Sequence, residues 1–80
     1  MISTYLIKSQ CNKSFYVGIS KDPVKRLSVH NRGGLKTTSS GRPWQLIYQK
    51  EHNSYELARK HERWLKKKSR DYKNKIGGVK

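Results

Sequence analysis

The sequence predicts an α+β domain in which helices flank a small, mainly antiparallel three-stranded sheet, in the order ββαβα with a short basic C-terminal tail or helix. Two observations lead to this prediction. Two apolar runs rich in β-branched and aromatic residues, 2–9 and 14–20, are joined by a turn-prone segment, which is typical of a hairpin. Helix and strand signals alternate after it, and 80 residues leave room for a single domain, 1–80.

The first helix is predicted to begin directly after the hairpin. Asp22 can cap its N-terminus, and Pro23 suits the first helical position, where its missing N–H costs nothing. The Asn-Arg-Gly-Gly segment at 31–34 ends this helix. Residues 32–41 are rich in Gly, Ser, Thr and basic side chains, with Leu35 as the one apolar residue, so we expect a flexible loop.

The second half of the chain predicts a strand and a longer helix. Residues 43–50 alternate well enough to form the third strand, with Trp44 favoured as a core residue. Residues 53–56 have the spacing of a capping box and open the longest helix. Beyond that helix the chain stays basic and loses its periodicity, so residues 71–80 are expected to form a partly ordered tail. The helix carries an apolar stripe with a period of 3.6 residues: Leu57, Ala58, His61, Trp64 and Leu65.

The charge of the chain points to a polyanionic partner. Nineteen Lys and Arg residues against five Asp and Glu residues give a net charge of +14. A basic surface kept for solubility is the alternative. We expect no membrane partner, since no segment approaches the roughly 18 apolar residues of a spanning helix and no signal peptide precedes the first strand. Cys11 is the only cysteine, so a cytoplasmic location is expected.

Two tyrosines on the predicted hairpin and two polar residues on the next helix form a specific pattern. Tyr5 lies in the first apolar run, and Tyr16 lies in the second, two residues before Gly18. A glycine inside a strand often marks a place where another group comes close. Arg26 follows ten residues after Tyr16, and His30 lies one turn further along the same helix face. Phenol, guanidinium and imidazole groups together suggest phosphate chemistry.

The spacing of these residues resembles the GIY-YIG nuclease domain family, in its short single-domain form, over roughly residues 4–75. Ser3-Thr4-Tyr5 stands where the first family tripeptide is expected, and only its tyrosine matches. The segment 16–18, Tyr-Val-Gly, fits the second tripeptide well. Arg26 matches the helix arginine of the family, and Glu62 stands where the metal-binding glutamate is expected.

This resemblance implies a hydrolase, a metal-dependent endonuclease that cuts DNA phosphodiester bonds in repair or recombination. Tyr16 would orient or deprotonate the attacking water, with Tyr5 supporting it through hydrogen bonding. Arg26 would neutralise charge in the transition state. His30 would assist proton transfer, or would pack near the end of the helix. Glu62 would bind one Mg²⁺ or Mn²⁺ ion, held weakly without DNA, or would form a salt bridge with a neighbouring Arg or Lys.

Further basic side chains flank the predicted site, and an asparagine in the C-terminal part is a candidate member of it. The basic residues expected to contact nucleic acid are Lys8, Lys21, Arg32, Lys36, Arg42 and Lys66. Asn74 is the candidate, because longer family members have an asparagine near the site. The expected partner is single-stranded, duplex or branched DNA, bound by a monomer or a homodimer. The alternative function is a non-catalytic nucleic-acid-binding module with the same fold.

Overall fold

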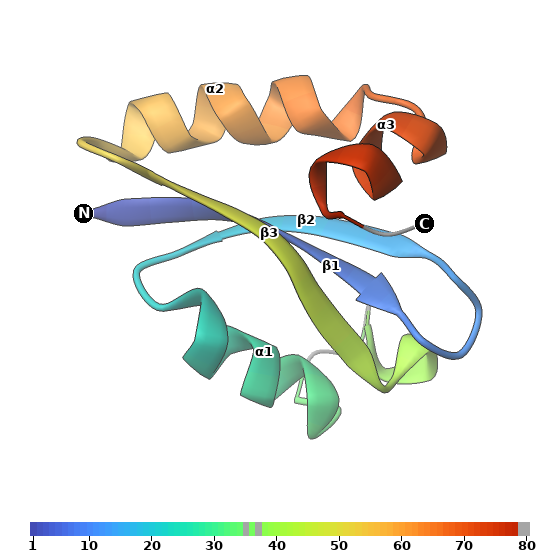
Figure 1. The fold of residues 1–80 in the computed structure, drawn as a ribbon. Helices are drawn as coiled ribbons and strands as arrows, with labels where there is room; N and C mark the ends of the chain where they lie inside the picture. Colours follow the sequence, from blue (N-terminus) through green and yellow to red (C-terminus); the bar gives the residue numbers. More distant parts are fainter. Residues whose placement is uncertain (35, 37, 79–80) are drawn as a thin grey trace.

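An antiparallel sheet of three strands, ordered β2-β1-β3, forms the centre of the computed structural model, which describes residues 1–34, 36 and 38–78 (Figure 1). The strands are β1 (Ile2–Ser9), β2 (Phe15–Ser20) and β3 (Trp44–His52). The predicted fold class is therefore confirmed. In the register of the hairpin Tyr5 lies opposite Gly18, so the central strand carries one predicted site residue against the glycine of the edge strand.

Helices cover both faces of the sheet (Figure 1). Helix α1 (Pro23–Asn31) lies on one face, and α2 (Tyr55–Lys66) and α3 (Arg70–Ile76) lie on the other. Alternate residues of β1 point to opposite faces, so each layer has its own small core. The cluster on the α1 side is built from Tyr5, Ile7 and Trp44, and the cluster on the α2 and α3 side from Leu6, Val17 and Leu65.

The start of α1 agrees with the prediction from the sequence, whereas the start of α2 differs from it. The Asp22 carboxylate accepts a hydrogen bond from the Lys25 N–H at the start of α1, as predicted. The capping box expected at 53–56 is wrong, because α2 begins one residue later. Its N-cap is Ser54, whose hydroxyl accepts from the Leu57 N–H, so Glu56 is not in the third helical position.

The C-terminal tail is more ordered than its sequence indicates. The Ser69 hydroxyl caps α3, a helix of only seven residues, which is too short to show a clear apolar period. Tyr72 and Ile76 of this helix pack against the core cluster beneath α2. The last two residues of the tail predicted over 71–80 lie outside the described residues.

The loop after α1 is only partly the flexible segment that its composition predicts. A short 3-10 helix (Ser39–Gly41) ends it, and Thr38 is buried. The Ser9 hydroxyl donates to the Gly41 carbonyl at 2.6 Å, and the indole N–H of Trp44 donates to the Thr38 carbonyl at 2.8 Å. Trp44 is a core residue, as expected, while Leu35 lies outside the described residues. The end of this loop is therefore held against the sheet.

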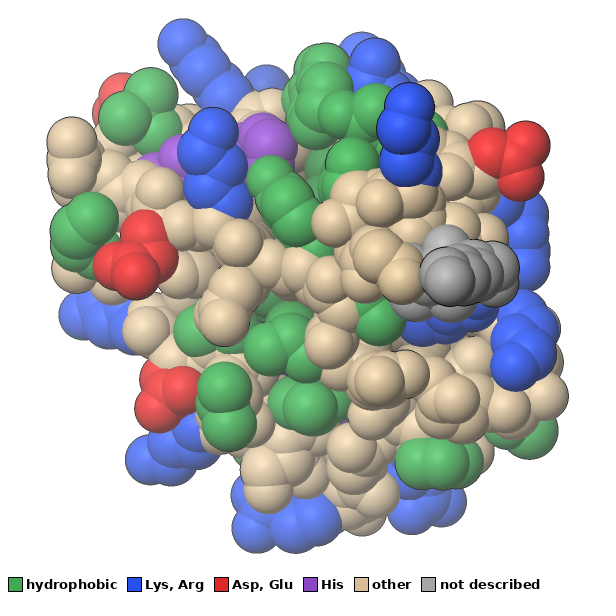
Figure 2. All heavy atoms as spheres, viewed as in Figure 1, with side chains coloured by type: hydrophobic (Ala, Val, Ile, Leu, Met, Phe, Trp, Pro, Cys, Tyr) green, Lys and Arg blue, Asp and Glu red, His purple; other side chains and the backbone are tan. Residues whose placement is uncertain are grey.

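Basic side chains surround both helical layers in the face shown in Figure 2, with acidic side chains scattered among them. Hydrophobic side chains gather nearer the middle of this face. The described helices include none with the length and apolar character needed to cross a bilayer.

Candidate active site

Tyr5 and Gly18 form the centre of the candidate site. The two residues are cross-strand partners, and the phenol of Tyr5 lies across the backbone of Gly18. A Cβ atom placed on Gly18 would meet the Tyr5 hydroxyl oxygen at 2.5 Å. The close approach that a glycine in this strand predicts is therefore made by the Tyr5 ring itself.

We expect Gly18→Ala to destabilise the domain, because the added methyl group and the Tyr5 ring would occupy the same space. The expected loss is about 1–3 kcal/mol in the free energy of unfolding, the usual cost of overpacking. Chemical denaturation measures it, with Ser28→Ala on the exposed surface of α1 as the control. An unfolding midpoint equal to that of the wild type would show that the ring does not need the space above Gly18.

His30 joins Tyr5 to the loop after α1. The Tyr5 hydroxyl is 2.9 Å from Nε2 of His30, and Nδ1 of the same ring is 2.8 Å from Oγ1 of Thr38. A neutral imidazole has one donor and one acceptor nitrogen, so both contacts are satisfied when Tyr5 donates to Nε2 and Nδ1–H donates to Thr38. The His30 side chain is fully buried, and burial and then the charge of Arg26 lower its pKa. The ring is therefore neutral near pH 7.

The ionisation of Tyr5 connects it to both flanking helices. Burial, followed by the neighbouring Tyr16, raises the pKa of Tyr5 to about 12. Hydrogen bonding to Arg26 and the positive charge of its guanidinium act in the opposite direction, and the negative charge of Glu62 raises the pKa further. Tyr5 is therefore a protonated hydrogen-bond donor at neutral pH. The charges of α1 and α2, which lie on opposite faces of the sheet, both act on this phenol.

Tyr16 is the more accessible of the two tyrosines. Its side chain is half-buried, whereas Tyr5 is only 1% exposed. The Tyr16 ring centroid is 6.4 Å from that of Tyr5 and 5.0 Å from that of His30, and the planes of the Tyr16 and His30 rings are inclined at 60°. The rings of Tyr5, Tyr16 and His30 form one group on the α1 face of the hairpin, called the tyrosine cluster below. Within the tyrosine cluster, Tyr16 is the phenol that solvent or a substrate can reach.

Arg26 and Glu62 supply the charges of the site. Arg26 is half-buried on α1 and lines a hollow that also includes Lys21. The Glu62 side chain is 16% exposed and lies 3.5 Å from the ammonium group of Lys66, one turn further along α2. This ion pair is one of the salt bridges that the sequence left open as an alternative, and a pair with an exposed lysine contributes little to stability.

The donor set at Glu62 fits a magnesium ion better than a zinc ion. The described residues contain no group of three or more His, Cys, Asp or Glu side chains that would enclose a metal. Mg²⁺ keeps several waters and is commonly bound by one or two carboxylates together with substrate phosphates, whereas structural zinc sites take four Cys and His ligands. A single carboxylate such as Glu62 therefore suits one Mg²⁺ or Mn²⁺ ion better than a zinc ion.

The other predicted nucleic-acid contacts are divided between this site and other surfaces. Lys21 and Lys66 lie beside Arg26 and Glu62 respectively. The Lys8 ammonium donates to Oδ1 of Asn74 at 2.8 Å, and this pair lies on the α3 side of the sheet, away from the tyrosine cluster. Three more basic side chains are exposed around the loop after α1: Arg32, Lys36 and Arg42.

Thr38 contacts the tyrosine cluster through His30, although no pattern in the sequence points to it. It lies in a loop rich in Ser, Thr and Gly, eight residues after the histidine that it contacts. A threonine in such a loop has no periodicity and no motif that would distinguish it from its neighbours. Its contact with His30 exists because the 3-10 helix and Trp44 fix the end of the loop.

Burial of two histidines should make the domain less stable in mild acid. The pKa values of His30 and His61 are both lowered from 6.5, chiefly by burial, so the unfolded chain takes up these protons first as the pH falls. The free energy of unfolding should therefore be highest above about pH 6.5 and decrease below it. Chemical denaturation across this range measures the slope, and His30→Gln should make it shallower. A slope identical to that of the wild type would contradict a neutral, buried His30.

Comparison with known proteins identifies one family over nearly the whole chain. The GIY-YIG catalytic domain matches residues 1–76. The UPF0213 protein SSP2268 of Staphylococcus saprophyticus is 40% identical over 73 residues, which cover 90% of this chain and 88% of that protein.

Fungal and trypanosome proteins match a shorter part of the chain. The structure-specific endonuclease subunit slx1 of Pyrenophora tritici-repentis is 43% identical over 47 residues, which cover 52% of this chain and 13% of that protein. A homologue of this subunit from Trypanosoma cruzi is 40% identical over 50 residues, which cover 54% of this chain and 10% of that protein. The matched region is thus a small fraction of these longer relatives. No solved structure matches significantly. On the length of the family match and the bacterial relative, the chain belongs to the GIY-YIG catalytic domain family.

Proposed function

We propose that this domain is a metal-dependent endonuclease that hydrolyses DNA phosphodiester bonds at the tyrosine cluster. The observation that carries the proposal is the packing of Tyr5, Tyr16 and His30 in one cluster, with the Tyr5 hydroxyl 2.9 Å from Nε2 of His30 and Arg26 on the helix that carries His30. In this proposal the guanidinium of α1 and the carboxylate of α2 would act on one phosphate beside the two phenols. Family membership and the name of the endonuclease subunit that the chain resembles support nuclease chemistry.

Each residue of the site would have a separate role in hydrolysis. Tyr16, the accessible phenol, would orient the attacking water and accept its proton. Tyr5 stays protonated at neutral pH and would keep donating to Nε2 of His30. His30 would act as a positioning residue, because its side chain is fully buried and cannot touch substrate. Arg26 would hold non-bridging phosphate oxygens and neutralise the charge that develops on them.

Glu62 would hold the metal ion together with the substrate phosphate. A divalent cation bound there supplies charge neutralisation of the phosphate and lowers the pKa of a coordinated water. A single carboxylate binds Mg²⁺ weakly, so DNA would complete the site. Lys66 would move from Glu62 toward the phosphate backbone when the ion binds, because the pair with Glu62 is held only at the surface of α2.

A non-catalytic nucleic-acid-binding module is the second candidate. The ion pair between Glu62 and Lys66 favours it, because a carboxylate engaged by an ammonium group is less available to a metal. The net charge of +14 is compatible with both functions. The two differ in their need for Tyr16, Arg26 and Glu62, which only an enzyme requires.

Cleavage of labelled DNA tests the proposal. Single-stranded, duplex and branched substrates are incubated with the protein in Mg²⁺, Mn²⁺ or EDTA, and an Arg26→Ala variant is run beside the wild type. We expect cleavage by the wild type that EDTA abolishes and that Arg26→Ala reduces strongly. Salt-sensitive binding with no cleavage of any substrate would favour the binding module instead.

A further inference from the structure

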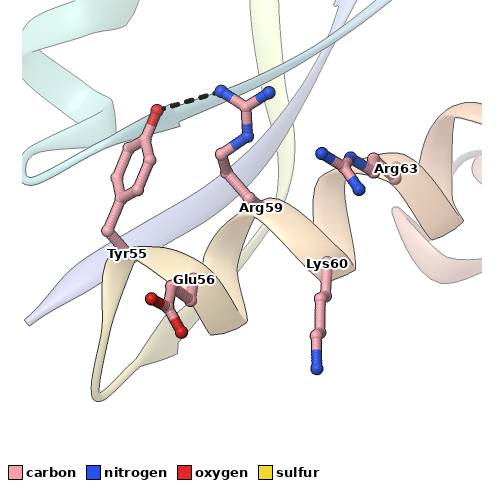
Figure 3. Close-up of a pocket in the computed structure, with 5 residues that line it drawn as sticks. All are labelled: Tyr55, Glu56, Arg59, Lys60 and Arg63. Carbon is pink, nitrogen blue, oxygen red and sulfur yellow. Dashed lines mark hydrogen bonds between the residues drawn. The ribbon is translucent and has the colours of Figure 1, made fainter.

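One flank of α2 carries a row of polar side chains next to Glu62. With 3.6 residues per turn, positions 55, 59, 62, 63 and 66 fall on the same side of the helix. The Arg59 guanidinium donates to the Tyr55 hydroxyl at 3.2 Å and lies 5.8 Å from the centre of that ring. Figure 3 shows Tyr55 and Arg59 rising from one side of the helix, whereas Glu56 and Lys60 point away from that side.

This flank is concave and connects to the candidate active site. Tyr55, Arg59 and Arg63 line one hollow together with Glu56 and Lys60, so four of its five lining residues are cationic or aromatic. Tyr55 also lines a second hollow together with Lys21. Lys21 in turn lines a third hollow with Arg26. Because Tyr55 borders the first two hollows and Lys21 borders the second and third, the three hollows are neighbours on the surface between Arg63 and Arg26.

The two arginines of this flank are available to bind an anion. Within the described residues the ion pair found is that of Glu62 with Lys66, and neither Arg59 nor Arg63 has an acidic partner in such a pair. Both guanidinium groups belong to exposed residues. The Tyr55 hydroxyl and ring hold the Arg59 guanidinium in place. The loss of side-chain conformational entropy on binding phosphate would therefore be smaller for Arg59.

We propose that this flank of α2, defined by Tyr55, Arg59 and Arg63, binds the phosphates of the DNA strand that extends from the scissile phosphate. The inference rests on the proposed function, because Glu62 and Arg26 mark where that strand would be cut. From Tyr55 to Arg63 the helix rises by about 12 Å. A duplex strand advances by about 3.4 Å per nucleotide along the duplex axis, so a helix flank parallel to that axis would span roughly three or four nucleotides.

Binding measurements on a charge-matched pair of variants test the inference. Arg59→Gln/Arg63→Gln removes two charges from the flank, and the control Lys50→Gln/Lys75→Gln removes two exposed charges from β3 and α3. Affinity for labelled single-stranded and duplex oligonucleotides is measured in EDTA over a range of salt concentrations. We expect the flank variant to bind at least about tenfold more weakly, with a salt slope reduced by about two for duplex. The control should stay close to the wild type.

The outcomes separate this inference from the proposed function. Equal affinities and equal salt slopes for the flank variant and the control would overturn the inference, whether or not the wild type cleaves DNA. If the wild type binds but cleaves nothing, while the flank variant alone loses affinity, the proposed enzyme fails and the phosphate-binding flank stands. Thermal unfolding of both variants, expected to match the wild type because all four residues are exposed, shows that lost affinity is not lost folding.

Discussion

Tyr16→Phe is expected to reduce the rate of DNA cleavage by about 10²–10⁴-fold, the usual contribution of general acid–base catalysis. The substitution removes one hydroxyl group from a half-buried ring and leaves its packing against Tyr5 and His30 in place. Stability and DNA affinity should therefore stay near those of the wild type. Single-turnover cleavage assays in Mg²⁺, with fluorescence binding assays in EDTA, separate the two effects.

A matched control for this change is Tyr72→Phe. Tyr72 is also half-buried, but it packs against Trp64 on α2, on the opposite side of the sheet. We expect it to cleave DNA at the wild-type rate. If Tyr16→Phe also cleaves at that rate, the accessible phenol has no part in proton transfer, and the buried Tyr5 with His30 would have to supply it.

Glu62→Gln is expected to abolish metal-dependent cleavage, with a loss of about 10³-fold or more. The side chain keeps its size and loses its charge, so the proposed Mg²⁺ site would lose its carboxylate ligand. The ion pair with Lys66 is lost as well, but its partner is largely exposed, and the cost to folding should stay below about 1 kcal/mol. Cleavage rates measured against Mg²⁺ concentration report the change.

Glu56→Gln is the control on the same helix, since Glu56 is exposed and points away from the flank near the site (Figure 3). It removes the same charge and should leave the Mg²⁺ dependence unchanged. Wild-type rates for Glu62→Gln would mean that Glu62 serves only as the partner of Lys66, and the ion would have to be bound elsewhere.

The parts of the fold that could be predicted are those that local sequence determines. The hairpin follows from two apolar runs around a turn, and the start of α1 follows from Asp22 and Pro23, which act within one turn of helix. β3 is visible through its alternation and runs two residues beyond the predicted end. The proximity of Tyr5 and Tyr16 also follows from the hairpin, because the register places them as diagonal neighbours on the same face of the two strands.

The remainder depends on contacts between residues far apart in the chain. Thr38 reaches His30 only because Trp44 and Ser9 fix the end of a loop whose composition predicts flexibility. α3 is stable because Tyr72 packs on the core under α2, which seven residues of sequence cannot reveal. Local patterns also failed at the start of α2, where adjacent Asn and Ser residues are both good caps and the structure uses the serine.

The assignment of Glu62 to the site depends partly on local sequence and partly on contacts between distant residues. Its position at the border of the apolar stripe is visible in the sequence, but its electrostatic effect on Tyr5 depends on how α2 lies across the sheet. The role of Glu62 as a metal ligand stays a prediction, and so does the role of Tyr16 in proton transfer.

The measurement that tests the account most directly is the single-turnover cleavage rate of the double variant Tyr16→Phe/Glu62→Gln beside the two single variants. Groups that act together on one phosphate are strongly non-additive, so the double variant should be about as slow as the slower single variant. Independent effects would multiply instead. A double variant slower by the full product of the two factors would contradict the claim that the tyrosine cluster and Glu62 meet at the same scissile phosphate.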